Sequence, residues 1–309
     1  MSLGVDLITG AKTCSFNCIY CQLGRTANLI SRPEDLRGYV RAKDVIEDLK
    51  SYSEKMDLGC VDVVTFSGNG EPTLNPELGL ILIEAKRFLG RGIPFVLLTN
   101  SSMLKRNDVR RAVSKFDIVC VKLDAGDEKT FRLINRPAKD VSDLETIVDS
   151  IKKLKKELSG KLMVQSMFLS TTLGFANCRG FAFERLLERI LSLDPDVIQV
   201  DTPFRPGGEE FVRHLSIKEL KEIGERFYEY FPRDKVWIFG VHERGGYVRW
   251  KKGIDLGPIV IDLLRRRPCR IEDMVNVLGV GYEEISRLVR ELLAKGVIER
   301  MGRGYYRIK

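Results

Sequence analysis

Short apolar, β-branched runs alternate along the chain with stretches of amphipathic, helical period. The runs predict strands near residues 4–8, 61–66, 93–99, 117–123, 162–169, 197–201 and 236–239. The stretches between them predict helices near residues 42–56, 77–90, 107–115, 141–157, 182–192 and 217–230. Short, nearly all-apolar strands separated by helices are typical of parallel strands that helices cover. We therefore expect a βα repeat, either an open doubly wound sheet or a complete or partial βα barrel.

The pattern changes in the last part of the chain. Pro258 stands near the start of an expected helix, a second helix is expected at 271–278, and a third at 282–295 stops at Gly296. Two short strands, 297–300 and 305–308, flank a glycine turn. Three helices and a terminal hairpin resemble a winged helix-turn-helix domain. We expect a βα domain at 1–243, a linker at 244–253 and a winged helix-turn-helix domain at 254–309.

Composition restricts the class of protein. The 309 residues include seven cysteines and carry a formal net charge of +8, which permits a nucleic-acid partner without requiring one. No apolar run reaches the ~18 residues of a membrane helix, and residues 1–10 lack the basic start and apolar stretch of a secretory signal. We therefore expect a cytoplasmic protein, in which clustered thiols point to metal or redox chemistry rather than to disulfides.

Three of the cysteines lie within eight positions, in the spacing Cys14-x3-Cys18-x2-Cys21. They follow the first expected strand, and ligands bind at the carboxyl ends of strands in βα folds. Thiolates hold iron–sulfur clusters, and a four-iron cluster with three protein ligands keeps one iron free. Two alternatives remain open: a zinc site, which needs a fourth ligand that no nearby residue supplies, and ordinary buried thiols.

The Cx3CxxC pattern, with an aromatic residue before its last cysteine, resembles the radical S-adenosylmethionine (SAM) superfamily. The resemblance implies a partial (β/α)6 TIM-like barrel, a [4Fe–4S] cluster on Cys14, Cys18 and Cys21, and SAM as cofactor. It also implies reductive cleavage of SAM to a 5′-deoxyadenosyl radical that abstracts hydrogen from a substrate. The aromatic residue, Tyr20, is expected to contact the cofactor.

The resemblance implies further cofactor contacts after the second strand. The run Ser67-Gly68-Asn69-Gly70-Glu71-Pro72 is similar to the family's glycine-glycine-glutamate-proline element, with Asn69 in place of the first of two adjacent glycines. Glycines let a backbone approach a ligand closely, so that its carbonyls can accept hydrogen bonds from the SAM ammonium group. An ordinary turn is the alternative for this loop.

The next three strands supply the remaining expected contacts. Asn100 and Ser101 end the third strand, where a helix cap is the alternative. Lys122 and Asp124 share one face of the fourth strand by its period of two, and a structural salt bridge is an equal alternative. By the family's topology Ser166, on the fifth strand, would also face inward.

Polar and reactive groups after the fifth and later strands are candidates for the substrate side. Cys178 could donate a hydrogen atom, although an ordinary thiol is the more usual role. Arg205 could hold an anionic substrate group through its planar fork. His242 could act as an acid or base, or cap the strand before it. Cys60 and Cys120 are interpreted as core residues of strands, and Cys269 as packing within the small domain.

Within the superfamily, three segments look most similar to the iron–sulfur oxidoreductases related to tRNA wyosine synthesis. They are residues 3–26, 70–74 and 121–125. The tRNA enzymes carry a second set of cysteines upstream, which this chain lacks before Cys14. We therefore expect one cluster and a reaction other than wyosine formation.

These features favour an enzyme with an unidentified substrate. The small domain would dock an RNA, a peptide or a protein, with DNA binding and a purely structural cap as the alternatives. A flavodoxin- or ferredoxin-like protein would supply electrons. The alternative from another class is an iron–sulfur or zinc transcriptional regulator whose winged helix binds DNA. A regulator does not need a βα barrel with polar groups at several strand ends.

Overall fold

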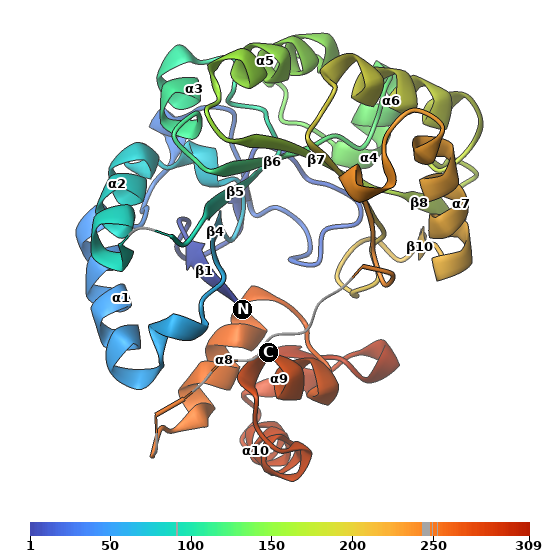
Figure 1. Cartoon of the computed structure of the whole chain (residues 1–309). Coiled ribbons are helices and arrows are strands. Elements are labelled where there is room, and N and C mark those ends of the chain that lie inside the picture. The colour runs from blue at the N-terminus through green and yellow to red at the C-terminus, as the bar shows by residue number, and fades with distance from the viewer. Residues whose placement is uncertain (91, 243–247, 249, 252) are drawn as a thin grey trace.

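Seven parallel strands form the central sheet, and they lie side by side in chain order. The computed structural model describes residues 1–90, 92–242, 248, 250–251 and 253–309. From one edge to the other the strands are β1 (Ser2–Asp6), β4 (Val63–Ser67), β5 (Phe95–Thr99), β6 (Ile118–Lys122), β7 (Lys161–Met167), β9 (Val197–Asp201) and β11 (Val236–Ile238). The sheet curls into an arc that is open on one side (Figure 1). Because all the strands are parallel, their carboxyl ends share one rim.

Helices cover the convex face of this arc (Figure 1). They are α1 (Ala42–Lys55), α2 (Leu78–Leu89), α3 (Asn107–Val113), α4 (Glu128–Asn135), α5 (Leu144–Glu157), α6 (Gly180–Leu193) and α7 (Ile217–Tyr228). Side chains stabilise several helix starts: Asp143 accepts a hydrogen bond from the backbone of Thr146, and Ser216 and Glu219 form the capping box that their spacing predicts. Among the residues that the structure describes, no helix is long and apolar enough to cross a membrane.

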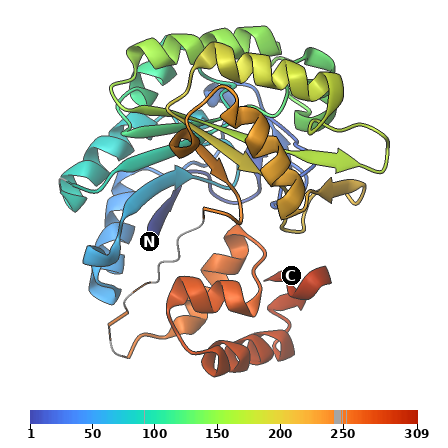
Figure 2. The same ribbon diagram turned by 45° about the vertical axis from the view of Figure 1, so that its right-hand side comes forward.

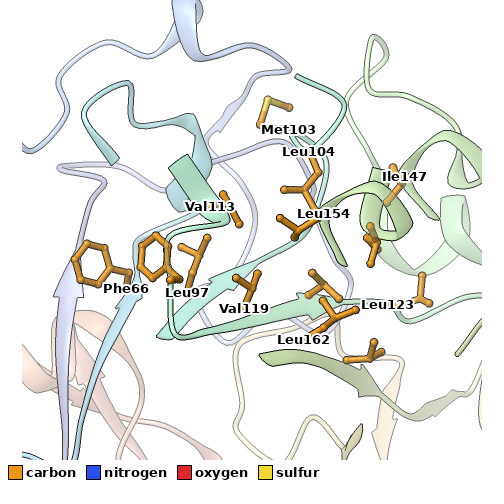
Figure 3. Packing of buried hydrophobic residues seen from close by; sticks show 14 of the residues in the cluster. Phe66, Leu97, Met103, Leu104, Val113, Val119, Leu123, Ile147, Leu154 and Leu162 are labelled. Atoms are coloured by element: carbon orange, nitrogen blue, oxygen red, sulfur yellow. The ribbon is translucent and has the colours of Figure 1, made fainter. Parts of the chain in front are cut away.

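Alternation along the strands separates two faces of the sheet. Val119, Val121 and Leu123 are buried in the core between the sheet and its helices. Figure 3 shows Leu97, Val119 and Leu162, from neighbouring strands, packed together with Val113 of α3 and Leu154 of α5. The intervening residues point to the concave face, where polar side chains are found.

Short elements lie around the carboxyl rim. β2 (Thr13–Cys14) pairs with β3 (Asn28–Leu29), and β8 (Leu169–Thr171) pairs antiparallel with β10 (Val212–His214). The first pair belongs to the loop that carries the clustered cysteines. The second extends the chain beyond the ends of β7 and β9.

The last part of the chain forms three helices and a hairpin, as expected. These are α8 (Leu256–Arg266), α9 (Ile271–Leu278), α10 (Tyr282–Ala294), β12 (Ile298–Arg300) and β13 (Tyr306–Ile308). They enclose a separate apolar core that contains Val260, Met274 and Ile285. This C-terminal unit lies across the open side of the arc (Figures 1 and 2). There, Nη1 of Arg266 is 3.4 Å from the carbonyl oxygen of Gly4.

The structure confirms the expected strands and corrects several details. All seven apolar runs form strands of one sheet, one strand more than a (β/α)6 barrel contains. Cys60 belongs to a short 3₁₀ helix, Leu58–Cys60, and not to a strand, because β4 begins only at Val63. The sequence pattern did not predict α4. Residues 244–247, 249 and 252 of the expected linker lie outside the described residues.

Candidate functional site

The three clustered cysteines lie on a loop at the carboxyl rim of the sheet. Hydrogen bonds from distant parts of the chain fix this loop. The backbone nitrogen of Ile19 donates to the carbonyl of Ile134 over 2.9 Å, and that of Glu209 donates to the carbonyl of Ile19 over 2.7 Å. Lys12 closes the loop with a 2.6 Å bond from Nζ to the carbonyl of Gly24. The fold therefore fixes the loop that carries the thiols.

Side-chain amides approach two of the three sulfur atoms. Nδ2 of Asn100 is 3.5 Å from Sγ of Cys14, and Nδ2 of Asn135 is 3.5 Å from Sγ of Cys18. Such N–H groups stabilise charge on a thiolate that binds a metal and tune its electronic properties. Asn135, at the end of α4, was not predicted, because a single asparagine at a helix end carries no sequence signal of its own.

The electrostatic surroundings of the thiols are negative. Burial, followed by the carboxylate of Glu71, raises the pKa of Cys14, and burial together with Asp124 raises the pKa of Cys18 to about 12. The protein by itself therefore disfavours thiolates here. A cationic metal centre reverses this preference, because thiols deprotonate when they coordinate.

The arrangement fits a cluster better than a single ion. Within the described part of the chain, no three His, Cys, Asp or Glu side chains converge on one metal position. In an iron–sulfur cluster each thiolate binds a different iron, so the sulfur atoms need not surround one point. Three thiols on one loop match the donor set of an iron–sulfur cluster, and the two amide contacts are of the kind that tune such clusters.

Asp124 connects the cysteine loop to the sheet. Its Oδ2 accepts hydrogen bonds from the hydroxyl of Tyr20 over 2.5 Å and from Nδ2 of Asn135 over 2.7 Å. Its Oδ1 accepts one from the backbone of Met167 over 2.8 Å. Burial, followed by the Asp124 carboxylate, raises the pKa of Tyr20, so its hydroxyl remains a donor. Asp124 and Tyr20 therefore hold the loop in position and are already satisfied by protein partners.

The loop after β4 packs directly on the cysteine loop. A Cβ atom on Gly70 would lie 1.6 Å from the carbonyl oxygen of Thr13, and the φ angle of Gly70 is +147°. Only glycine fits this close approach. Gly68 is similarly confined, since a Cβ atom there would lie 2.8 Å from Oδ1 of Asp6. Ser67 is half-buried at the end of β4.

Glu71 is fully occupied by protein donors. Its Oε1 accepts from the hydroxyls of Thr73 and Thr99, and its Oε2 accepts from the backbone nitrogen of Asn100 over 2.7 Å. Burial raises its pKa, and these hydrogen bonds oppose the rise. Glu71 therefore fixes the end of β5, where Asn100 contacts Cys14.

Ser101 combines three unusual features at the end of β5. It is fully buried, its φ angle is +70°, and its Oγ has no hydrogen-bond partner among the described residues. A serine in the left-handed region costs free energy, as does a buried hydroxyl without a partner. Backbone strain of this kind is found preferentially at functional sites.

The concave face of the sheet carries a polar group beside this rim. Lys122 Nζ lies 3.7 Å from Oδ1 of Asp124 and 3.4 Å from Oε1 of Gln165. Nε2 of Gln165 in turn donates to Oδ2 of Asp201 over 3.0 Å. Burial raises the pKa of Asp201, which Lys122 partly opposes. Gln165 was missed, although a polar residue in an apolar strand, aligned with Lys122, was a usable signal.

Ser166 does not face this polar group, contrary to expectation. It is fully buried, and its hydroxyl donates to the carbonyl of Leu123 over 2.5 Å. Because side chains alternate along β7, Ser166 lies on the opposite face of the strand from its neighbour Gln165. The alternation of side chains along β7 predicts the face on which Ser166 lies, whereas the topology of the family implies the opposite face.

Two further candidates do not reach the cysteine loop. Cys178 packs against the main core, its charged neighbours are Arg179 and Glu219, and burial raises its pKa. The structure thus gives no support to Cys178 as a hydrogen-atom donor. Nδ1 of His242 accepts from the backbone of Ile238 over 2.9 Å, which is the capping alternative. Cys120 is buried but lies on the concave face, with Lys122 and Asp201 as its charged neighbours.

Comparison with known proteins identifies related sequences and folds. A model of the radical SAM superfamily matches residues 8–170. The chain is 28% identical over 293 residues to UPF0026 protein MJ1312 of Methanocaldococcus jannaschii, covering 94% of this chain and 87% of that protein. The C-terminal unit is therefore at least partly shared with that relative.

Two solved structures show a similar fold. One is Streptococcus suis SuiB bound to S-adenosylmethionine, with a TM-score of 0.55, 15% identity and coverage of 78% of this chain. This chain spans about half of SuiB, 51% of its length. The other is TYW1 with a lysine-pyruvate adduct bound, with a TM-score of 0.50, 16% identity, and coverage of 75% of this chain and 77% of TYW1.

Proposed function

Because the chain belongs to the radical SAM superfamily, we propose that it is an enzyme that binds a [4Fe–4S] cluster through Cys14, Cys18 and Cys21. When bound, such a cluster offers one iron to SAM and supplies the electron that cleaves SAM to a 5′-deoxyadenosyl radical for hydrogen abstraction. The observation that carries this proposal is the loop of three thiols, two of which receive side-chain amide contacts at the carboxyl rim.

The surrounding residues take distinct parts in this proposal. Asn100 and Asn135 donate to the cysteine sulfurs; Glu71 holds the backbone of Asn100, and Asp124 holds the side-chain amide of Asn135. Ser101 offers to SAM a hydroxyl that has no partner among the described residues, and the loop of residues 67–70 packs through Gly70 on Thr13, the residue before Cys14. Ser67, Gly68 and Gly70 are therefore proposed as SAM contacts, whereas Tyr20, Glu71 and Asp124 position the site.

The concave face then belongs to the substrate. Lys122 and Asp201 present opposite charges there, linked through Gln165. Lys122, whose side chain is 17% exposed, is the more accessible member of this pair, which can bind a polar substrate and orient it toward the radical. The position of Lys122 within 5.2 Å of the Tyr20 ring centre places this group beside the cysteine loop.

The C-terminal unit is proposed as a winged helix-turn-helix domain, residues 254–309, joined by a linker at 244–253 to a barrel domain at 1–243. Its three helices, antiparallel hairpin and separate core support this assignment. We propose that it docks an RNA, peptide or protein substrate. A flavodoxin- or ferredoxin-like protein would be the electron donor, since radical SAM enzymes need a reductant.

The superfamily membership and the seven-stranded sheet do not favour a transcriptional regulator. The fold similarity to TYW1 supports kinship with the wyosine-related oxidoreductases. The sequence identity of 16% carries no conclusion about the reaction.

The proposal is tested by reconstituting the full chain with iron and sulfide in the absence of oxygen, then adding dithionite and SAM. We expect a brown protein that releases 5′-deoxyadenosine and that loses both properties in Cys14→Ser, Cys18→Ser or Cys21→Ser. Cys178→Ser and Cys60→Ser are the matched controls and should retain them. A colourless protein that binds zinc and shifts operator DNA would instead support the regulator.

A further inference from the structure

Arg205 occupies the seam between the barrel and the C-terminal unit. It lies in the loop after β9, with its guanidinium 4.5 Å from the centre of the Phe204 ring. Its Nη1 is 3.4 Å from Oε1 of Gln22, the residue that follows Cys21. Its charged and polar neighbours in the C-terminal unit are Arg267, Cys269, Asp273 and Tyr305. The Arg205 side chain therefore lies close both to the cysteine loop and to the C-terminal unit.

Arg267 is the charged residue of the C-terminal unit that acts most strongly on Arg205. It follows the last residue of α8. The Nε atoms of Arg205 and Arg267 are both buried and both lack a hydrogen-bond partner. Neither guanidinium has an ion-pair partner among the residues that the structure describes. Among the described arginines, only these two have a buried nitrogen without a hydrogen-bond partner, and both lie at this seam.

Two neighbouring guanidinium groups that form no ion pair with a described residue are costly. Burial lowers the pKa of Arg205, and the positive charge of Arg267 lowers it further. The carboxylate of Asp273 is nearby, but its Oδ2 accepts from the backbone nitrogen of Arg270 over 2.9 Å, where it caps α9. Arg270 adds a third cation and lies 4.5 Å from the Tyr305 ring centre. With Asp201 also close to Arg205, three arginines face two carboxylates at this seam, and the excess of positive charge favours an anionic ligand.

We propose that Arg205 and Arg267 bind a phosphate group of the substrate between the two domains. A carboxylate has two oxygens and satisfies one guanidinium fork, whereas a phosphate has enough oxygens to accept from two forks at once. Arg205 also lies close enough to Asp201 to lower its pKa, so the site adjoins the concave face. A ligand anchored here would extend past Asp201 and Lys122 toward the cysteine loop.

That the phosphate belongs to a substrate rests on the proposed function; that the two arginines bind phosphate does not. Phosphate binding is measured without SAM or reductant, and SAM cleavage is measured without phosphate, so either can fail alone. The probes are inorganic phosphate, pyrophosphate, a short single-stranded RNA and succinate, titrated calorimetrically into the full chain at constant ionic strength.

We expect the wild-type chain to bind the phosphate probes, and Arg205→Gln and Arg267→Gln to bind them roughly ten- to a hundredfold more weakly. Arg265→Gln is the matched control, because Arg265 is exposed and pairs with Asp262 instead. Tighter binding of RNA than of pyrophosphate would identify a nucleic-acid backbone as the source of the phosphate, and the reverse would identify a small phosphorylated molecule.

Melting temperature distinguishes a binding role from a structural one. In phosphate-free buffer, Arg267→Gln should melt at or above the wild-type temperature, because the substitution relieves repulsion between like charges. Phosphate should then raise the melting temperature of the wild type and of Arg265→Gln only. The proposal is overturned if the wild type binds no phosphate probe, if succinate binds as tightly as phosphate, or if both variants lose stability regardless of phosphate.

Discussion

The local conformation of Ser101 illustrates how a single residue can favour a ligand at the expense of stability. Replacing it by glycine removes both the strained φ of +70° and the buried hydroxyl without a partner. We expect Ser101→Gly to be as stable as the wild type or more stable by about 1 kcal/mol, because glycine tolerates this conformation. SAM should bind roughly tenfold more weakly if Oγ is a SAM contact.

The measurement pairs thermal unfolding with SAM titration. Ser102→Ala is the control: Oγ of Ser102 is bonded to Oγ of Ser15 over 2.6 Å, so its loss should cost about 1 kcal/mol of stability. Unchanged SAM affinity in Ser101→Gly would remove Ser101 from the SAM site.

The amide of Asn135 gives a second prediction at the residue scale. Hydrogen bonds to cluster sulfurs raise the reduction potential because they stabilise the added electron. We expect Asn135→Ala to lower the potential by about 50 mV, the one-electron equivalent of one hydrogen bond. The check is a redox titration followed by electron paramagnetic resonance. Asn17→Ala is the control, since Oδ1 of Asn17 bonds the backbone of Thr26. Equal potentials in the two variants would contradict the assigned role.

Sequence reasoning located the cysteines and the strand-end polar residues, but it could not separate ligands from supports. Glu71 and Asp124 looked like candidate SAM contacts, and only three-dimensional packing shows that protein donors satisfy them. Asn135 was invisible because its partners are 117 and 11 residues away in the chain. The sequence likewise could not show that the Ser101 hydroxyl lacks a hydrogen-bond partner, because this depends on which residues pack around it in the fold.

At the scale of elements, the loop after β4 is coupled to the cysteine loop through Gly70. A side chain there would collide with the Thr13 carbonyl and push the two loops apart. We expect Gly70→Ala to lower the free energy of unfolding by about 3 kcal/mol and to reduce iron retention after reconstitution.

Gly174 provides the matched control for this substitution. Its φ angle is also positive, +88°, but a Cβ atom there would meet nothing within 4 Å. Gly174→Ala should therefore cost only about 1 kcal/mol, the conformational penalty, and should retain iron. Equal losses in the two variants, measured by denaturant unfolding and iron content, would show that loop contact is unimportant.

The elements themselves were largely predictable. Apolar β-branched runs gave the strands because the sheet is buried on its convex side, and helical periodicity gave α1, α2 and α7. The helix α4 was missed although α9, which also has eight residues, was predicted, so shortness alone does not explain the omission. β2 and β3 pair over two residues each, so tertiary contact, and not local sequence, defines them.

For the whole molecule, the contact between His214 and Arg303 links the barrel to the C-terminal hairpin. Nη1 of Arg303 is 3.1 Å from Nδ1 of His214, which can accept a hydrogen bond only when the imidazole is neutral at that atom. Burial, followed by Arg303, lowers the pKa of His214 below its ordinary value of 6.5. The unfolded chain therefore binds the proton more readily, and stability falls as pH drops through 6.5.

We expect the melting temperature to fall more between pH 7.5 and 5.5 in the wild type than in His214→Gln, since glutamine can accept from Arg303 but does not titrate. Differential scanning calorimetry at both pH values measures this difference. Parallel losses in the two proteins would show that His214 does not couple the domains to pH.

The central claim is that three thiolates hold a cluster with one iron open to SAM. Electron paramagnetic resonance of the oxygen-free, dithionite-reduced protein, recorded with and without SAM, tests it most directly. We predict a [4Fe–4S]⁺ signal that changes when SAM is added and that is absent in Cys18→Ser. A signal of fully protein-coordinated iron that SAM leaves unchanged would contradict the account.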